Sequence, residues 1–460
     1  MPNGSIKTDH PWWLGWPFII ALAVTLRGGL FLAGLWRPAE FLAPDSADYL
    51  RLAGDLARHG CFGLAQPELF RVPAYPMWLA LFSGLGAWAV PVTVAAQLAL
   101  DVALVWVTAR LAGALGESQS GKTEGRKNGR DGAGADRWAA LWQAGSVAAA
   151  VGAAKLLSDS LFAFGVALLL LALLRVAATP SRRWGVWLVL GAAAGALVLV
   201  RVVLLPFLPV MALYVAWRCR SRATAWFLAG ALVVLGGWMA RNEWRTGYPG
   251  ISTVSAINLG RYQAAAVNAR LNGSAFAGEQ GLIDDRLAAE PDQAAQGRLA
   301  ARLGRQALRE HPGLFVRVWV MADLRNLLPA TGEALRYLGV PVGGAGTLAA
   351  WQSGGWRAAL DRYFGGAPWA LALALPDTLV VLAKYLAALA GALWLWRRTP
   401  QRRPELLLVL ALLAWLLLAP GVVAHPRFRV PAEPLLAVLA AWGVMGIGRQ
   451  QTADWGSAHP

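Results

Sequence analysis

Three carboxylates and a set of arginines lie at the edges of the apolar segments of this chain. Asp45 and Asp48 belong to PDSADY, directly after the first apolar segment, and Asp159 belongs to KLLSDSLF, between two later ones. A carboxylate can orient or deprotonate a hydroxyl group, and a guanidinium binds phosphate through parallel hydrogen bonds. The arginines at comparable positions are Arg71, Arg201, Arg241, Arg427 and Arg429. These residue types suit chemistry in which a hydroxyl group attacks a phosphate-linked substrate.

The composition places these residues in a membrane protein. The 460 residues are 57% hydrophobic and 15% charged, with a mean hydropathy of +0.46, which is too apolar for a water-soluble globule. Lipid offers backbone groups no partner, so spanning segments must be helical, and we predict an all-α polytopic fold with about ten transmembrane helices. The first is expected to be a retained signal anchor. The spans are expected near residues 15–36, 89–109, 138–156, 160–178, 184–200, 203–217, 225–240, 369–396, 405–423 and 432–448.

Basic residues between the apolar segments predict the orientation, because cytoplasmic loops collect Lys and Arg near helix ends. The clusters lie within residues 110–130, 175–183, 218–222 and 397–403. We therefore expect residues 113–137 in the cytoplasm, and residues 37–88 and 241–368 on the opposite side. The net charge of +16 is then largely a topology signal, and we expect no nucleic-acid partner.

This topology divides the chain into three parts. Residues 1–240 are predicted to form a transmembrane catalytic core, residues 241–368 a large external loop with amphipathic helices, and residues 369–460 the C-terminal transmembrane helices. The two cysteines, Cys61 and Cys219, fall on opposite sides of the membrane, so no disulfide is expected.

The string GESQSGKT at residues 116–123 matches a phosphate-binding loop pattern. That pattern works between a buried strand and the N-terminus of a helix, whereas here an apolar helix precedes it and EGRKNGRDGAGAD follows. We predict a flexible polar linker and no bound nucleotide.

Asp45 and Asp48 have two interpretations. The stretch PDSADYLRLAGDLARHG predicts an amphipathic helix along the membrane surface, in which Asp45 is the N-cap and Asp48 completes a capping box. The alternative is a catalytic role. Arginines on the non-cytoplasmic side, such as Arg71 and Arg201, oppose the usual charge bias and favour an anionic ligand there.

Other charged residues also keep alternatives. Arg427 and Arg429 could clamp phosphate or anchor the chain at the interface, with His425 beside them as a helix-end residue. Arg241 and Asn242 could bind sugar hydroxyls or form a turn. Arg27 and Asp101, each near the middle of a predicted span, are expected to form a structural ion pair.

Taken in order, these motifs resemble GT-C glycosyltransferases of the protein O-mannosyltransferase and lipid A aminoarabinose transferase type. The matching pieces are DSADYLRLA, RVPAYPMWLAL, LLSDSLF, GAAAGALVLVR, WMARNEWRTG with ISTVSAINL, EHPGLF and RFRVPAEP. Each is loose by itself, but the ordered set spans nearly the whole membrane region.

The resemblance implies an inverting hexosyl- or pentosyltransferase. It would move a sugar from a polyprenyl-phosphate carrier to a lipid, glycan or protein acceptor, at a bacterial plasma membrane, with its active site facing the periplasm or exterior. Asp45 would be the catalytic acidic residue, with Asp48 beside it and Asp159 as the second acid. Arg71 would hold the carrier phosphate, and Tyr75 lies in the same substrate-binding segment.

The chain departs from the family in two places. The first loop has a D-x-x-D pattern rather than a contiguous acidic pair or D-x-D, which leaves a requirement for a divalent metal open, and the insert at residues 113–137 is unusually long. The rival class is a membrane transporter or lipid flippase, which would place ionisable residues near the midplane of two related halves. No such repeat is apparent in the sequence.

Overall fold

The computed structural model describes residues 11–116, 125–179, 183–219, 221–343 and 346–458. This part of the chain is helical and contains no strand. Seven helices within it are long and apolar enough to cross a membrane. They are α1 (Trp16–Trp36), α4 (Ala89–Gly116), α7 (Asp159–Ala178), α9 (Leu208–Cys219) with the turn before it, α10 (Ser221–Thr246), α18 (Ala370–Arg398) and α20 (Glu433–Ala458) with the turn before it. The chain is therefore an all-α polytopic membrane protein, as predicted.

The number of membrane-spanning helices differs from the prediction, and one predicted span is interrupted. Two further apolar helices are shorter: α8 (Trp184–Val198) has 15 residues and α19 (Arg403–Leu418) has 16. The predicted span at 138–156 is wrong, because the helix is interrupted within it: α5 (Gly125–Ala144) ends at Ala144 and α6 (Val147–Ala154) starts a new helix. Ser146 caps α6 by accepting a hydrogen bond from the Ala149 amide, so the break is encoded locally.

The insert at residues 113–137 is helical where the structure describes it, whereas the flexible linker was predicted for residues 116–123. The helix α4 continues to Gly116, and α5 already begins at Gly125. Most of the phosphate-loop-like string lies outside the described residues.

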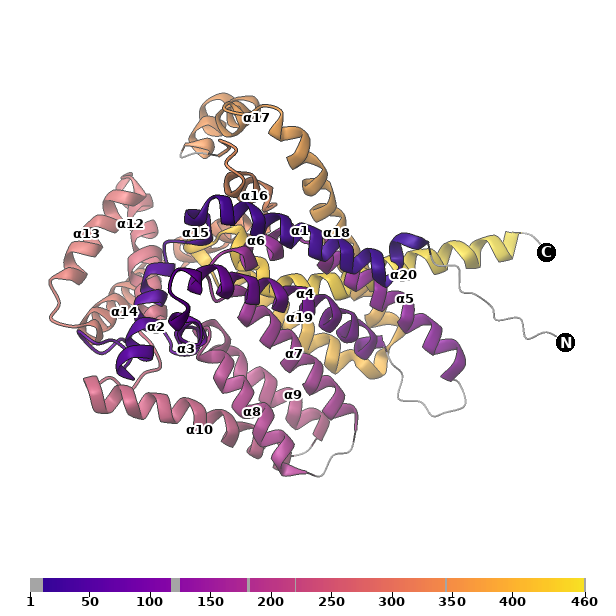
Figure 1. Ribbon diagram of the computed structural model, residues 1–460, viewed down its shortest axis with the longest axis horizontal. Helices are drawn as coiled ribbons and strands as arrows, with labels where there is room; N and C mark the ends of the chain where they lie inside the picture. Colours follow the sequence, from indigo (N-terminus) through magenta and orange to yellow (C-terminus); the bar gives the residue numbers. More distant parts are fainter. Residues whose placement is uncertain (1–10, 117–124, 180–182, 220, 344–345, 459–460) are drawn as a thin grey trace.

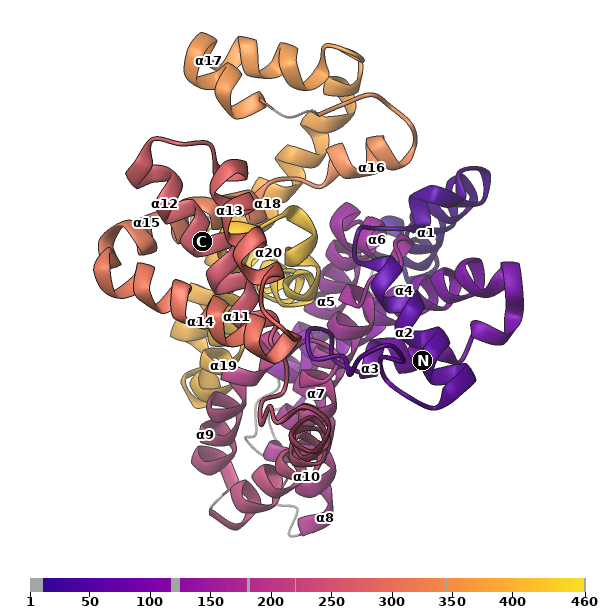
Figure 2. The ribbon, with the colours of Figure 1, turned by 90° about the vertical axis from the view of Figure 1, so that its left-hand side faces the viewer.

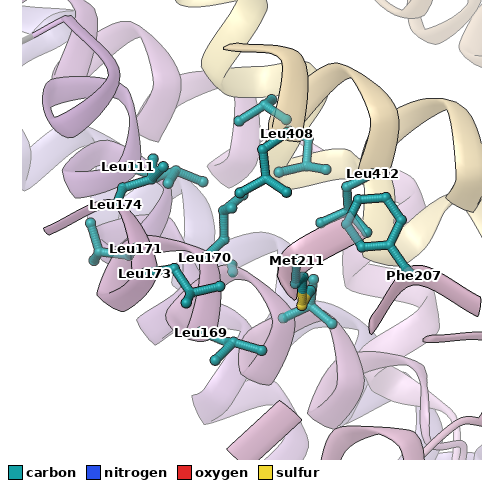
Figure 3. Packing of buried hydrophobic residues seen from close by; sticks show 14 of the residues in the cluster. Leu111, Leu169, Leu170, Leu171, Leu173, Leu174, Phe207, Met211, Leu408 and Leu412 are labelled. Carbon is teal, nitrogen blue, oxygen red and sulfur yellow. The ribbon is translucent and has the colours of Figure 1, made fainter. Parts of the chain in front are cut away.

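The core lies between helices from distant parts of the chain. Leu111 of α4, Leu170 of α7, Met211 of α9 and Leu412 of α19 interdigitate in it (Figure 3). Two helix pairs, α8 with α10 and α18 with α20, pack most closely at glycines. A Cβ atom at Gly230 would collide with the Leu188 carbonyl of α8, so these backbones approach as near as small residues permit.

The helices outside the bundle gather at one end. They are α2 (Ser46–His59), α3 (Ala74–Ala80), α11 (Val254–Ile257), the π-helical turn η5 (Asn258–Ala264), α12 (Ala265–Asn272), α13 (Phe276–Ala288), α14 (Gln293–Glu310), α15 (Pro312–Asp323) and α16 (Thr331–Tyr337). In Figure 1, α2, α3 and α12 to α14 lie at the end opposite the finish of α20. The helix α17 (Thr347–Phe364) stands apart from the bundle at one edge (Figure 2).

The first loop and the large loop contact each other at this end. The Thr253 amide donates to the Leu69 carbonyl at 2.9 Å, and the Gln293 side chain accepts from the Leu69 amide at 2.7 Å. These bonds join segments that the sequence places on one side of the membrane.

The predicted ion pair between Arg27 and Asp101 is confirmed. The Arg27 Nη2 and Asp101 Oδ2 atoms are 2.7 Å apart, and both side chains are buried. Arg27 also donates to the Ala144 carbonyl at 2.6 Å, so one guanidinium ties together α1, α4 and α5.

Candidate active site

Asp45 stands at the start of α2, but it does not cap this helix. Its backbone has φ −75° and ψ −17°, which is helical, and its carboxylate accepts no bond from the first turn. The predicted capping role is therefore wrong. Ser46 fixes the start of the helix instead, because its hydroxyl accepts from the Ala43 amide and donates to the Leu156 carbonyl, both at 2.8 Å.

The Asp45 carboxylate lies between two guanidinium groups. Its Oδ1 atom accepts from Arg71 Nη2 and its Oδ2 atom from Arg427 Nη2, both at 2.9 Å. Burial by itself would raise the pKa of Asp45, but the charges and hydrogen bonds of the two arginines outweigh it, and the pKa lies below its usual value. Asp45 is therefore held ionised, with both oxygens engaged.

Arg71 is held in place by the segment that carries it. It also contacts Asp48, with Nη2 3.0 Å from Oδ2, and its guanidinium lies over the rings of Tyr49 and Phe70. Its backbone amide donates to Glu68 at 3.0 Å. Charge pairing and ring stacking together fix the direction in which the guanidinium points.

Asp159 forms a second acid–arginine pair. It is buried at the first turn of α7 and bonded to Arg201. The Arg201 guanidinium lies 5.6 Å from the ring centre of Phe428, the residue after Arg427. The Ala74 amide donates to the Leu199 carbonyl at 3.0 Å, which joins this region to the segment after Arg71. The pairs Asp45–Arg71 and Asp159–Arg201 thus both contact the turn that carries Arg427 and Phe428.

That turn, η9 (Pro426–Ala432), sends its two arginines in different directions. Arg427 reaches Asp45, as described above. Arg429 is only 1% exposed and pairs with Glu433 at 2.5 Å. The two predicted members of a phosphate clamp therefore do not converge, and only Arg427 belongs to the site around Asp45.

Three other predicted ligand-binding residues make internal contacts. The Tyr75 hydroxyl is buried and donates to Gln97 Oε1 at 2.7 Å. Arg241 donates to the carbonyls of Phe62 and Glu68, and so supports the segment that leads to Arg71. The side-chain amide of Asn242 donates a hydrogen bond to the Gly250 carbonyl at 2.8 Å. We interpret these residues as supports of the site.

A second charged cluster was not identified from the sequence. Glu333 of α16 contacts Lys155, Arg336 and His425. The hydrogen bond from His425 comes first among the causes that lower the pKa of Glu333 to about 2, with Arg336 and Lys155 adding to it. The sequence signals were Lys155, a basic residue directly before LLSDSLF, and His425, which was interpreted only as a helix-end residue.

An apolar groove of about 600 Å³ lies next to the start of α2. Nine residues line it, all of them nonpolar, including Phe41, Leu42 and Trp88. They belong to the end of α1, the turn η2 (Pro38–Phe41) with Leu42 after it, the turn η3 (Ser83–Trp88) and the start of α4. Leu42 lies three residues before Asp45, so the apolar groove and the charged site share one short segment of the chain.

The carboxylates of the site, Asp45, Asp48 and Asp159, do not form a metal-binding group. Among the residues that the structure describes, no three His, Cys, Asp or Glu side chains are grouped so that they could hold a metal ion. Asp45 and Asp48 instead share Arg71.

No protein-family model and no curated protein sequence matches the chain. Among solved structures, the chain is similar to ArnT from Cupriavidus metallidurans, in the apo state and bound to undecaprenyl phosphate. Both matches have 15% sequence identity and a TM-score of 0.36, and cover 94% of this chain and 77% of the other.

Proposed function

We propose that the chain is a membrane glycosyltransferase that moves a sugar from a polyprenyl-phosphate carrier to a lipid, glycan or protein acceptor, with inversion, on the non-cytoplasmic side. The observation that carries this proposal is the Asp45 carboxylate held between Arg71 and Arg427. This places a proton acceptor and two phosphate-binding groups at one point, beside an apolar groove.

Each residue then has a role in one displacement. The carrier phosphate binds Arg71 and Arg427, which neutralise the negative charge that grows as the bond from the anomeric carbon to phosphate breaks. Once the phosphate has taken over these arginines, an Asp45 oxygen is released and accepts the proton of the acceptor hydroxyl, whose oxygen attacks the anomeric carbon from the opposite face. The bond electrons leave with the phosphate, and the new glycosidic bond has inverted configuration. The pair of Asp159 and Arg201 lines the same turn and supports the pocket.

The setting agrees with a lipid-linked donor. The apolar groove next to Asp45 suits an isoprenoid chain that enters from the bilayer. Residues 1–240 supply the catalytic core, residues 241–368 cover it and select the acceptor, and residues 369–460 supply Arg427. We place the protein in a bacterial plasma membrane, with the site facing the periplasm or exterior.

The alternative, a membrane transporter or lipid flippase, is favoured by one observation. Lys384, Arg429 and Glu433 form an ionisable cluster inside the helix bundle, where transport proteins often bind ions. The adjoining cavity measures about 10 Å³, which is too small for a sugar or a lipid headgroup. The enzyme is therefore the better-supported proposal.

Two experiments test the proposal. Purified protein in nanodiscs should bind undecaprenyl phosphate, and mass spectrometry of envelope glycolipids and glycoproteins should show a sugar that is absent from cells lacking the protein. Identical envelopes and no carrier binding would contradict it.

The sidedness is tested separately. In a background with Cys61→Ser and Cys219→Ser, an impermeant thiol reagent should label Gln280→Cys from outside and Ser120→Cys only after permeabilisation. Equal external labelling of both would exclude the proposed topology.

A further inference from the structure

The turn η9 connects the proposed active site with the interior of the bundle. It runs from Pro426 to Ala432 between α19 and α20, and contains Pro431 as a second proline. Prolines fix the φ angle, so the turn has few alternative conformations. Because Arg427 and Arg429 are separated by one residue of this stiff turn, the position of one constrains the position of the other.

Arg429, which points into the bundle, forms several hydrogen bonds there. Arg429 Nε donates to Glu433 Oε1 at 2.5 Å, and Arg429 Nη1 donates to the Leu328 carbonyl at 2.8 Å and to the Tyr385 hydroxyl at 2.7 Å. These partners come from α20, from the segment before α16 and from α18. One guanidinium thus joins three parts of the fold to the turn.

Glu433 is the centre of this buried network. Its second oxygen, Oε2, accepts from Lys384 Nζ of α18 at 2.7 Å and from the Ser146 hydroxyl at 3.0 Å. The side chains of Glu433, Lys384 and Arg429 are each no more than 5% exposed. The carboxylate therefore has both oxygens bonded, and α5–α6, α18 and η9 all depend on it.

The outer end of the turn is anchored by a second acid. His425 Nδ1 accepts from the Arg427 backbone amide at 3.3 Å, and His425 Nε2 lies 3.1 Å from Glu333 Oε1. A histidine that accepts at Nδ1 carries its proton at Nε2, which suits donation to Glu333. The backbone of Arg427 is thus held from outside by Glu333 and from inside by Glu433.

We infer that Glu433 is a positioning residue, which holds the turn η9 through Arg429 so that Arg427 meets Asp45 and the donor phosphate. The inference rests on the proposed function. A role in stability alone is a poorer account of the network, because a buried set of charges loses much of its hydration and hydrophobic replacements are often as stable. What such a network supplies is one defined arrangement of the groups that it joins.

The test combines Glu433→Gln with Arg427→Gln in a double-mutant cycle. If Glu433 acts through Arg427, Glu433→Gln should lower the transfer rate about 10-fold in the wild-type background and leave it unchanged in the Arg427→Gln background. Equal losses in both backgrounds would overturn the inference. Glu405→Gln is the matched control, since Glu405 is also buried and paired with two arginines, Arg218 and Arg402, which both lie outside the turn.

A second variant guards against misfolding. Lys384→Met, Arg429→Met and Glu433→Leu together remove all three buried charges, and this triple variant should accumulate normally yet transfer slowly. Normal transfer by it would overturn the inference.

Hydrogen exchange of residues 425–432 gives a readout that does not need catalysis. Exchange should rise in Glu433→Gln and stay unchanged in Glu405→Gln. If the wild-type protein transfers no sugar, the proposed function fails, while unchanged exchange in Glu433→Gln would show that Glu433 does not hold the turn.

Discussion

The variant Asp45→Asn separates a proton-accepting role from a purely structural one. Asparagine keeps one oxygen that can accept from Arg71 or Arg427, but its amide group faces the other guanidinium as a second donor. The variant therefore loses one of two charge-assisted hydrogen bonds, each 2.9 Å long. At this half-buried position the lost hydrogen bond costs about 1.5 kcal/mol. If the whole loss appears in the activation barrier, the transfer rate falls roughly 10-fold. A general base contributes a factor of about 10² to 10⁴ to the rate, so the loss of this role exceeds the structural effect.

We therefore expect Asp45→Asn to lower the transfer rate at least 100-fold, while its abundance and carrier binding stay near wild type. The assay is transfer of radiolabelled sugar by protein in nanodiscs, with undecaprenyl phosphate binding measured on the same preparation. Asp48→Asn is the matched control, because Asp48 contacts Arg71 but not Arg427, and it should lower the rate less than 10-fold. A tenfold loss or less in Asp45→Asn, or equal losses in the two variants, would refute the base assignment.

Three further predictions concern charge, pH and packing. Arg71→Ala should weaken carrier binding about 10-fold or more. Arg71→Lys should weaken it less, because lysine keeps the positive charge but lacks the paired N–H donors of the guanidinium. Equal binding by wild type and both variants would show that Arg71 only anchors the chain at the membrane interface. Glu333 has a pKa lowered to about 2, so its stabilising contribution is complete above pH 4.5 and is lost as the pH falls towards 2. Thermal unfolding should therefore separate wild type from Glu333→Gln at pH 6, with the difference narrowing below pH 4; a constant difference would argue against the ion cluster. Gly230→Ala should destabilise the protein by about 1 to 3 kcal/mol, because the new Cβ atom collides with α8. Gly236→Ala should leave the stability unchanged, because a Cβ atom there meets no neighbour. Equal melting temperatures for the two variants would contradict this packing.

The membrane fold followed from the sequence because it depends on local composition. An apolar run of sufficient length can only be a helix in lipid, and α1, α7 and α18 lie close to their predicted bounds. The failure at residues 138–156 has a local cause as well. Gly145 and Ser146 interrupt an apolar run, and a hydropathy average over the whole run does not register a capping serine.

The candidate site was predicted only in part. The sequence indicated Asp45, Arg71 and Arg427 from residue type and from their place at segment ends, and the structure brings these three side chains together. It could not indicate that Arg427 and Arg429 diverge, because the directions of side chains in a short turn depend on what surrounds it. Nor could it identify Glu333, because two of its partners, Lys155 and His425, lie far from it in the chain.

Asp45 and Arg427 are separated by 382 positions in the sequence. Asp45 follows the first spanning helix, and Arg427 precedes the last, so their contact exists only after α20 has packed against α4 and α5. The buried bonds of Glu433 to Lys384, Arg429 and Ser146 lie in the same packed region. The second guanidinium of the site therefore depends on the packing of the last helix, whereas Arg71 lies in the loop that also carries Asp45.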